Sequence, residues 1–312
     1  MRLFWTGMIA YICMPAIAKA DVLPLEEALR ATYVACVGID DELSDMKKMA
    51  GINTAVTAVG TAAGAGATVV GLVKASKDKQ IATLEEELAR LRALTAGREI
   101  TAPDRDEVLT GMQRYYDANK DMAREKEDEI TALTKQSKRL GNWRTGLMAG
   151  STATNVAGAI IAGNNKVDQD LQQQIADCRK QVENLSNSIM QARLDGYDVT
   201  EALDIVAACR QYEYVDVSKI NSRAKGALIS SVIGATTGAA GTVTSAIANT
   251  DKTRNDNTDA GKQTEKNLNT ASNILAGATT LASGTATVFN AAQISAIKKV
   301  ATVAEACTGV LK

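Results

Sequence analysis

Four uncharged stretches rich in Ala, Gly, Ser and Thr constrain the fold of this chain more than any other feature. They span residues 57–73, 145–163, 226–250 and 267–297. Proline, which interrupts helices, stands only at Pro15, Pro24 and Pro103. Runs of β-branched or aromatic residues that alternate with polar ones, as in strands, are hard to find. The sequence therefore predicts an all-α fold built from long helices.

Glycines four residues apart recur inside three of these stretches. A glycine weakens an isolated helix by about 1 kcal/mol relative to alanine, so a compensating contact is expected. Small residues at this spacing let two helix backbones come closer than the usual ~8–10 Å. The pairs are Gly60 with Gly64, Gly146 with Gly150, and Gly234 with Gly238. We expect these six glycines to mark the faces on which the small-residue helices pack into a bundle.

The same stretches admit two environments. Each approaches or exceeds the ~20 residues that a membrane span needs. However, they contain few of the Leu, Ile and Phe residues that favour insertion, and asparagines lie in or beside them. The asparagines are Asn53, Asn155, Asn249 and Asn273. This composition favours a water-soluble bundle, and membrane insertion is the alternative.

A charged region with heptad spacing separates the first two stretches. Ile81, Leu84, Leu88 and Leu91 follow one another at steps of three and four. A second seam repeats every seven residues, through Leu109, Tyr116, Ala123, Ile130 and Ser137, with Met112, Asn119, Lys126, Leu133 and Leu140 as companion positions. We expect these two helices to form an antiparallel coiled-coil arm over about residues 75–140, turning at a loop that holds Gly97 and Pro103. The alternative is that both helices belong to a larger bundle and do not project.

The first twenty residues have the layout of a secretory signal peptide. Arg2 precedes a long apolar run, and the small-residue pattern Ala18-Lys19-Ala20 precedes Asp21. Cys13 lies inside the apolar run and would be removed with it. The sequence therefore predicts an exported protein, periplasmic or extracellular.

Four cysteines remain after the predicted cleavage: Cys36, Cys178, Cys209 and Cys307. An even number in an exported chain indicates two disulfides. The segment EALRATYVAC ends at Cys36, and EALDIVAAC ends at Cys209. This repeated order predicts an internal duplication, with one hairpin over residues 21–195 and a second over 196–312. We therefore expect the pairs Cys36–Cys178 and Cys209–Cys307, although four cysteines permit other pairings.

The composition argues against several classes of function. The chain has no histidine, which is the side chain best suited to acid–base catalysis near neutral pH and the commonest metal ligand. Its 35 basic and 36 acidic residues create no field that would hold nucleic acid. We expect no catalytic residues, no metal and no cofactor.

The expected function is that of a non-enzymatic helical scaffold of the cell envelope or extracellular space. It would associate with itself or with another protein through the arm. The alternative hypothesis is a membrane-active protein whose Gly/Ala-rich helices insert into a bilayer or form pores in it.

Overall fold

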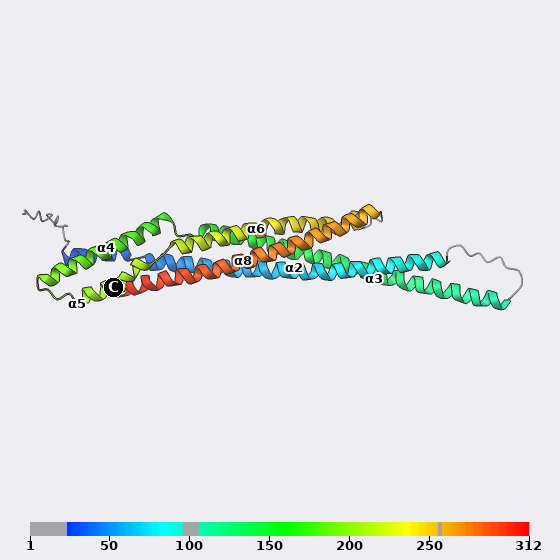
Figure 1. Ribbon diagram of the computed structural model, residues 1–312, viewed down its shortest axis with the longest axis horizontal. Helices are drawn as coiled ribbons and strands as arrows, with labels where there is room; N and C mark the ends of the chain where they lie inside the picture. The colour runs from blue at the N-terminus through cyan, green and yellow to red at the C-terminus, as the bar shows by residue number, and fades with distance from the viewer. Residues whose placement is uncertain (1–23, 96–105, 255–257, 312) are drawn as a thin grey trace, which may run out of the picture. The chain divides into compact units, whose positions relative to one another are not determined.

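The computed structural model describes residues 24–95, 106–254 and 258–311, which are helical over most of their length (Figure 1). The helices are α1 (Leu25–Cys36), α2 (Ile39–Thr95), α3 (Asp106–Asn164), α4 (Gln169–Leu194), α5 (Thr200–Cys209), the 3₁₀ turn η1 (Arg210–Tyr214), α6 (Ser218–Ala248), α7 (Asp251–Arg254) and α8 (Asp259–Leu311). No strand occurs in these ranges, so the all-α prediction is confirmed for them. The predicted signal peptide and the loop with Gly97 and Pro103 lie outside the described residues.

The described helices form two compact units, each of which draws on both halves of the chain. Unit 1 contains α1, the start of α2 as far as Glu42, α4, α5, η1, and α8 from Val300. Unit 2 contains α2 from Leu43, α3, α6, α7, and α8 as far as Lys299. The predicted duplication follows the order of features along the chain, and it stays a prediction.

Unit 1 has an ordinary apolar core. Its buried cluster joins α1, α4 and α5 through Ala28, Leu185, Ile189, Ala192, Val199 and Ala202. Asp168 caps α4 by accepting a hydrogen bond from the Leu171 amide. Gly38 makes the turn from α1 to α2 with a φ of +93°, a conformation that glycine adopts without strain.

Unit 2 is built around four long helices that pack in the cyclic order α2, α3, α6, α8. Ser151 of α3 donates to the Gly60 carbonyl of α2 at 2.8 Å. The Thr145 and Ser245 hydroxyls join α3 to α6, and the Thr237 and Thr279 hydroxyls join α6 to α8. Asn53 donates to Asn290, which closes the ring between α2 and α8. The four small-residue stretches thus pack against one another.

Four of the six predicted packing glycines lie where neighbouring helices come close. A Cβ added to Gly60 would lie 2.5 Å from the Thr154 hydroxyl of α3. A Cβ added to Gly238 would lie 2.5 Å from the Thr152 hydroxyl, also of α3. At Gly64 it would lie 3.3 Å from the Thr280 Cα of α8, so here the obstacle includes backbone. At Gly234 it would lie 2.7 Å from Asn155. These positions exclude a larger side chain unless a neighbour moves.

The expectation fails for Gly146 and Gly150. Both glycines are exposed, and a Cβ at either would meet nothing within 4 Å. The buried face of α3 runs instead through Met148, Ser151, Asn155 and Gly158. Gly158, absent from the prediction, is the crowded position: a Cβ there would lie 2.8 Å from Thr57. The glycine spacing alone did not reveal which face of α3 turns inward.

Most described residues of the predicted heptad seams are buried or half-buried, but Tyr116, a predicted seam residue, is 42% exposed. Leu88 of α2 and Leu133 of α3 are buried, as are the polar seam residues Asn119 and Ser137. Ion pairs cross between the segments, from Arg92 to Glu127 at 2.7 Å and from Lys126 to Glu87 at 2.5 Å. These contacts fix the antiparallel register of α2 and α3 in this region.

Candidate functional site: an apolar belt around a polar core

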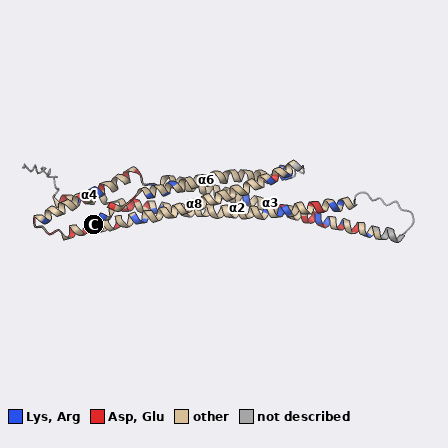
Figure 2. Cartoon of the chain, in the orientation of Figure 1, with Lys and Arg blue, Asp and Glu red and all other residues tan. Residues whose placement is uncertain are grey.

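Unit 2 contains a band without charges, which we call the belt. Its four segments are residues 49–73, 145–165, 226–250 and 267–297. They lie in α2, α3, α6 and α8, and the second and third extend one or two residues beyond the ends of α3 and α6. The hydrogen bonds that close the four-helix ring all join residues within these segments. Figure 2 shows the result, with Lys, Arg, Asp and Glu gathered on either side of an uncharged middle.

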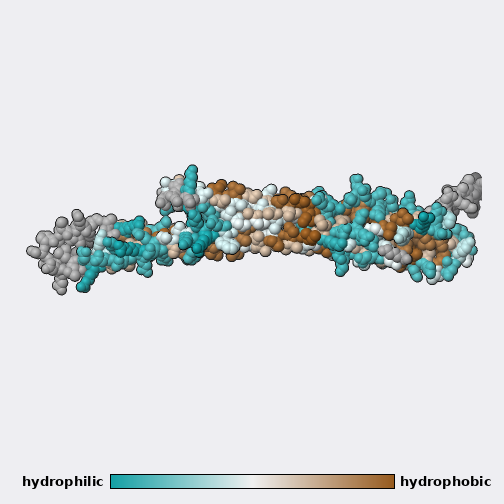
Figure 3. Space-filling view, turned by 180° about the vertical axis from the view of Figure 1, so that it is seen from behind, coloured by the Kyte–Doolittle hydropathy of each residue, from teal (hydrophilic) through white to brown (hydrophobic). Residues whose placement is uncertain are grey.

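The outer surface of the belt is apolar. Its exposed large side chains are Met49, Ile52, Val59, Val69, Leu72, Val73, Val156, Ile160, Ile229, Val232, Ile233, Val243, Ile247, Ile274, Leu281 and Val288. Alanines and glycines fill most of the exposed positions between them. Figure 3 shows brown and pale atoms over this band and teal where charged residues begin. The apolar side chains come from all four helices, so they surround the bundle.

Polar groups on the belt surface bond to their own helix. Away from the belt ends, the exposed polar residues are Thr236 and Thr285. Their hydroxyls donate to the carbonyls of Val232 at 3.1 Å and Leu281 at 2.8 Å. Half-buried threonines such as Thr68 do the same, donating to the carbonyl four residues earlier. The belt therefore presents few polar groups that need water.

The interior of the belt contains many small and polar residues beside an apolar cluster of Ala67, Met148 and Ala276. Its buried polar residues are Asn53, Thr57, Ser151, Asn155, Asn165, Ser230, Ser231, Ser245, Ser272, Thr279, Ser283, Asn290 and Gln293. Asn155 Nδ2 donates to Ser283 Oγ at 2.8 Å, linking α3 to α8. Asn53 Nδ2 donates to Asn290 Oδ1 at 3.0 Å, and Asn290 donates to Thr57. Small side chains and hydrogen bonds between helices thus hold the four helices together.

The belt reverses the arrangement found in unit 1. A helix of a water-soluble domain turns its apolar stripe to the core and its polar face to water. Unit 1 follows this rule, with Leu185 and Ile189 inside. In the belt, Asn53 and Asn155 are fully buried, whereas Val69 and Leu281 are largely exposed. Small and polar residues at helix contacts, with aliphatic residues outside, are the pattern of helices that pack in lipid.

A buried ionic layer bounds the belt at the end nearer the arm. Lys74 is 1% exposed, and its Nζ lies 2.6 Å from Asp78 and 3.8 Å from Glu265 of α8. Ser137 of α3 donates to the other Asp78 oxygen. Burial raises the pKa of the Glu265 carboxyl, and the Lys74 ammonium acts in the opposite direction. The layer joins α2, α3 and α8.

Two further residues stand at this end of the belt. Arg144 is buried, donates to the Asn269 carbonyl at 3.3 Å, and has its pKa lowered to about 10 by burial. Trp143, by contrast, is 70% exposed and borders a shallow hollow with Gly146 and Leu147. An exposed indole at the edge of an apolar band is typical of membrane–water interfaces.

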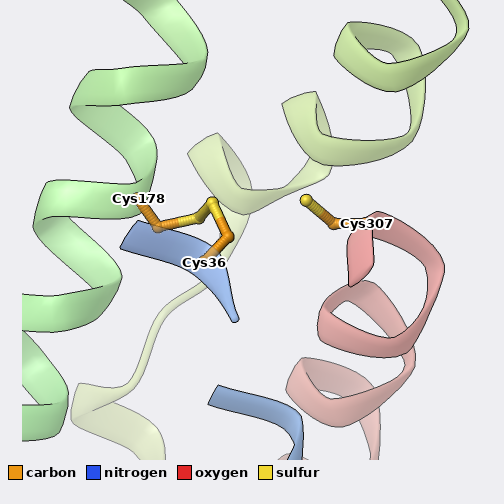
Figure 4. Close-up of side chains that lie close together, drawn as sticks. All are labelled: Cys36, Cys178 and Cys307. Carbon is orange, nitrogen blue, oxygen red and sulfur yellow. A yellow bond between two sulfur atoms is a disulfide. The ribbon is translucent and has the colours of Figure 1, made fainter. Parts of the chain in front are cut away.

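The four cysteines form two neighbouring disulfides in unit 1. Cys36 is bonded to Cys178 and Cys209 to Cys307, with Cα–Cα distances of 4.8 and 4.5 Å. This is the pairing expected from the sequence. The sulfurs of Cys36, Cys178 and Cys307 lie within 4.8 Å of one another, as Figure 4 shows. Because all four sulfurs are bonded in pairs, the cluster offers disulfides and not thiolate ligands, and it suits an oxidising compartment.

Comparison of the chain with protein-family models, curated proteins and solved structures finds no match. Two helical stretches among the described residues have the length and apolar composition of a membrane span, one within Leu25–Leu94 and one over Ser218–Ala248; the belt segments of α3 and α8 are not among them. Buried core helices can pass the same test, but less than half of each apolar window is buried here. The belt is therefore the feature from which a function can be inferred.

Proposed function

We propose that the protein is a non-enzymatic scaffold whose four-helix belt sits in a lipid bilayer and whose coiled-coil arm meets a partner. One observation carries this proposal: the belt is apolar outside and has small and polar side chains at its helix contacts. The sequence composition favoured a water-soluble bundle, and the exposed surface favours the membrane alternative. Aliphatic side chains are stable against lipid tails, and interior residues such as Asn155 and Asn290 bond to neighbouring helices.

The dimensions of the belt support the proposal. Its shortest helical segment, residues 145–164 of α3, is about 30 Å long at 1.5 Å per residue. The hydrocarbon core of a bilayer is about 30 Å thick. Charged residues then begin on every helix, as at Lys48 and Lys74 of α2 or Lys225 of α6. The backbone groups inside the belt are paired within helices, as a bilayer requires.

A second copy of the chain explains the belt less well than lipid does. A dimer contact would bury one patch of each molecule. Aliphatic residues instead face outward from α2, α3, α6 and α8, for example Val69, Val156, Val232 and Leu281. Lipid is the partner that covers all these faces at once.

The arm extends the pair α2 and α3 beyond the tip of the other hairpin. Arg254 donates to the Thr134 carbonyl, and Lys262 pairs with Glu85, so the α6–α8 tip reaches this level. The Glu87–Lys126 and Arg92–Glu127 pairs lie farther along α2 and α3. Figure 1 shows both helices continuing past the ends of α6 and α8. This geometry supports a projecting coiled-coil arm as predicted from the heptads.

The arm offers a surface for association with another protein or with a second copy. Tyr115, Tyr116 and Met122 are exposed on α3, and Leu94 is exposed on α2. Acidic and basic residues alternate around them, which provides no continuous basic surface for nucleic acid. A helical partner that covers these side chains is the chemistry we propose for the arm.

Co-flotation with liposomes and alkaline carbonate extraction test the membrane proposal. The full chain, expressed in bacteria with its own leader, should remain in the membrane pellet after carbonate treatment and should require detergent for solubility. Purified protein reconstituted into liposomes should float with them. Recovery of a monodisperse, detergent-free protein in the carbonate supernatant would contradict the proposal.

A further inference from the structure

The disulfides and the belt together determine how the chain would cross a bilayer. This inference rests on the proposed membrane function and adds the side on which each segment lies. The four belt segments are bonded into one ring, so they would cross together, which gives an even number of crossings. Residues 24–48, 166–225 and 298–311 therefore share one side, and residues 74–95, 106–144, 251–254 and 258–266 share the other.

The first group of segments contains every cysteine of the described chain. Cys36 precedes the first belt segment, Cys178 and Cys209 lie between the second and third, and Cys307 follows the fourth. Because both disulfides join members of this group, all three segments belong in an oxidising compartment. The predicted signal peptide requires the same side for the segment that follows it.

The second group, which includes the arm, contains no cysteine. Nothing in its composition ties it to an oxidising environment. Lys and Arg residues flank both ends of the belt, so charge does not decide the orientation. The disulfides therefore carry the assignment.

We infer that the chain crosses the membrane four times, with both disulfides on the oxidising face and the arm on the opposite, reducing face. The arm then meets a protein of the reducing compartment or the arm of a second copy there. The belt links an oxidised, disulfide-bonded unit to a coiled coil in another compartment. A soluble exported scaffold would place both in the same compartment.

Labelling of single engineered cysteines with a membrane-impermeant maleimide tests this topology. The native cysteines are bonded and buried, so they do not compete for label under non-reducing conditions. Ala132→Cys places a thiol on an exposed site of the arm, and Leu194→Cys places one on an 81% exposed site at the end of α4. Both variants are expressed as full chains in bacteria, and spheroplasts are labelled before and after disruption.

The topology predicts that Leu194→Cys is labelled in intact spheroplasts and that Ala132→Cys is labelled only after disruption. Labelling of both sites in intact spheroplasts, of the arm site alone, or of neither site would overturn it. Carbonate extraction of the same spheroplasts shows whether a wrong labelling pattern refutes the topology alone or the membrane proposal as well. A chain that stays in the pellet with the wrong labelling pattern refutes the topology only, whereas release into the supernatant refutes both.

Discussion

Gly64 and Gly150 form a matched pair for testing the packing of the belt. Both are glycines inside uncharged helical segments and belong to predicted glycine pairs. Gly64 is buried where α2 approaches α8, and a Cβ added to it would lie 2.8 Å from the Thr280 hydroxyl and 3.3 Å from the Thr280 Cα. Gly150 is exposed and has open space around it. The substitutions Gly64→Leu and Gly150→Leu thus make the same chemical change in opposite environments.

The expected difference follows from two effects. Leucine is a better helix former than glycine, which favours both variants by up to about 1 kcal/mol. At position 64 the side chain must also displace the backbone of α8, and such overpacking typically costs about 1–3 kcal/mol or more. We therefore expect Gly64→Leu to destabilise the protein and Gly150→Leu to leave it unchanged or slightly more stable.

Thermal unfolding followed by helical circular dichroism, in one detergent for all samples, measures this difference. The unfolding midpoint should fall for Gly64→Leu and should hold or rise for Gly150→Leu. Equal loss in both variants, or a neutral Gly64→Leu, would show that α2 and α8 do not approach each other closely at this position.

Three further changes give expected outcomes. Leu281 is 75% exposed at the middle of the belt, and Leu281→Arg puts a charge there that costs about 2.5–3.5 kcal/mol at the centre of a bilayer. The yield of protein in the membrane pellet should therefore fall. The control Leu194→Arg, outside the belt, should leave that yield unchanged. The disulfides span 142 and 98 residues, and reducing them should lower the free energy of unfolding by about 4–5 kcal/mol for each bridge in the entropic model. The denaturation midpoint should fall when a phosphine reductant is added, and an unchanged midpoint would contradict this. Burial raises the pKa of Glu265, so the folded state binds its proton more tightly than the unfolded chain, and stability should decline as pH rises from the unfolded pKa through the folded one. The melting temperature measured across this pH range should decline less in Glu265→Gln than in the unchanged protein. The same decline in both proteins would count against a role for Glu265.

Helix content and disulfide pairing were accessible from the sequence because local signals carry them. The near absence of proline left the helices uninterrupted, and the repeated order of cysteines and uncharged stretches indicated which cysteines pair. The heptad seam was also readable, since Leu88 and Leu133 of the seam are buried in the charged segments of α2 and α3. These features depend on neighbours in sequence or on periodicity.

The orientation of the uncharged helices was not accessible by the same means. Residues such as Ala, Gly and Thr occupy every face of these helices, so spacing did not show that Gly146 and Gly150 point outward. The asparagines were counted against insertion, yet Asn53 and Asn155 lie inside and bond across helices. A usable signal was present: Asn53, Thr57 and Gly60 share one face of α2, while valines occupy the other.

Depth-dependent quenching of tryptophan fluorescence by brominated lipids tests the central claim most directly, namely that lipid surrounds the belt. Trp143 is the one tryptophan that follows the predicted signal peptide, and it stands at the belt edge. In reconstituted vesicles, lipids brominated near the headgroup should quench it more than lipids brominated deep in the acyl chains. Leu281→Trp in a Trp143→Phe background should show the reverse order, because position 281 lies at mid-belt. Two indoles that emit as in water, and that neither lipid quenches, would contradict the account.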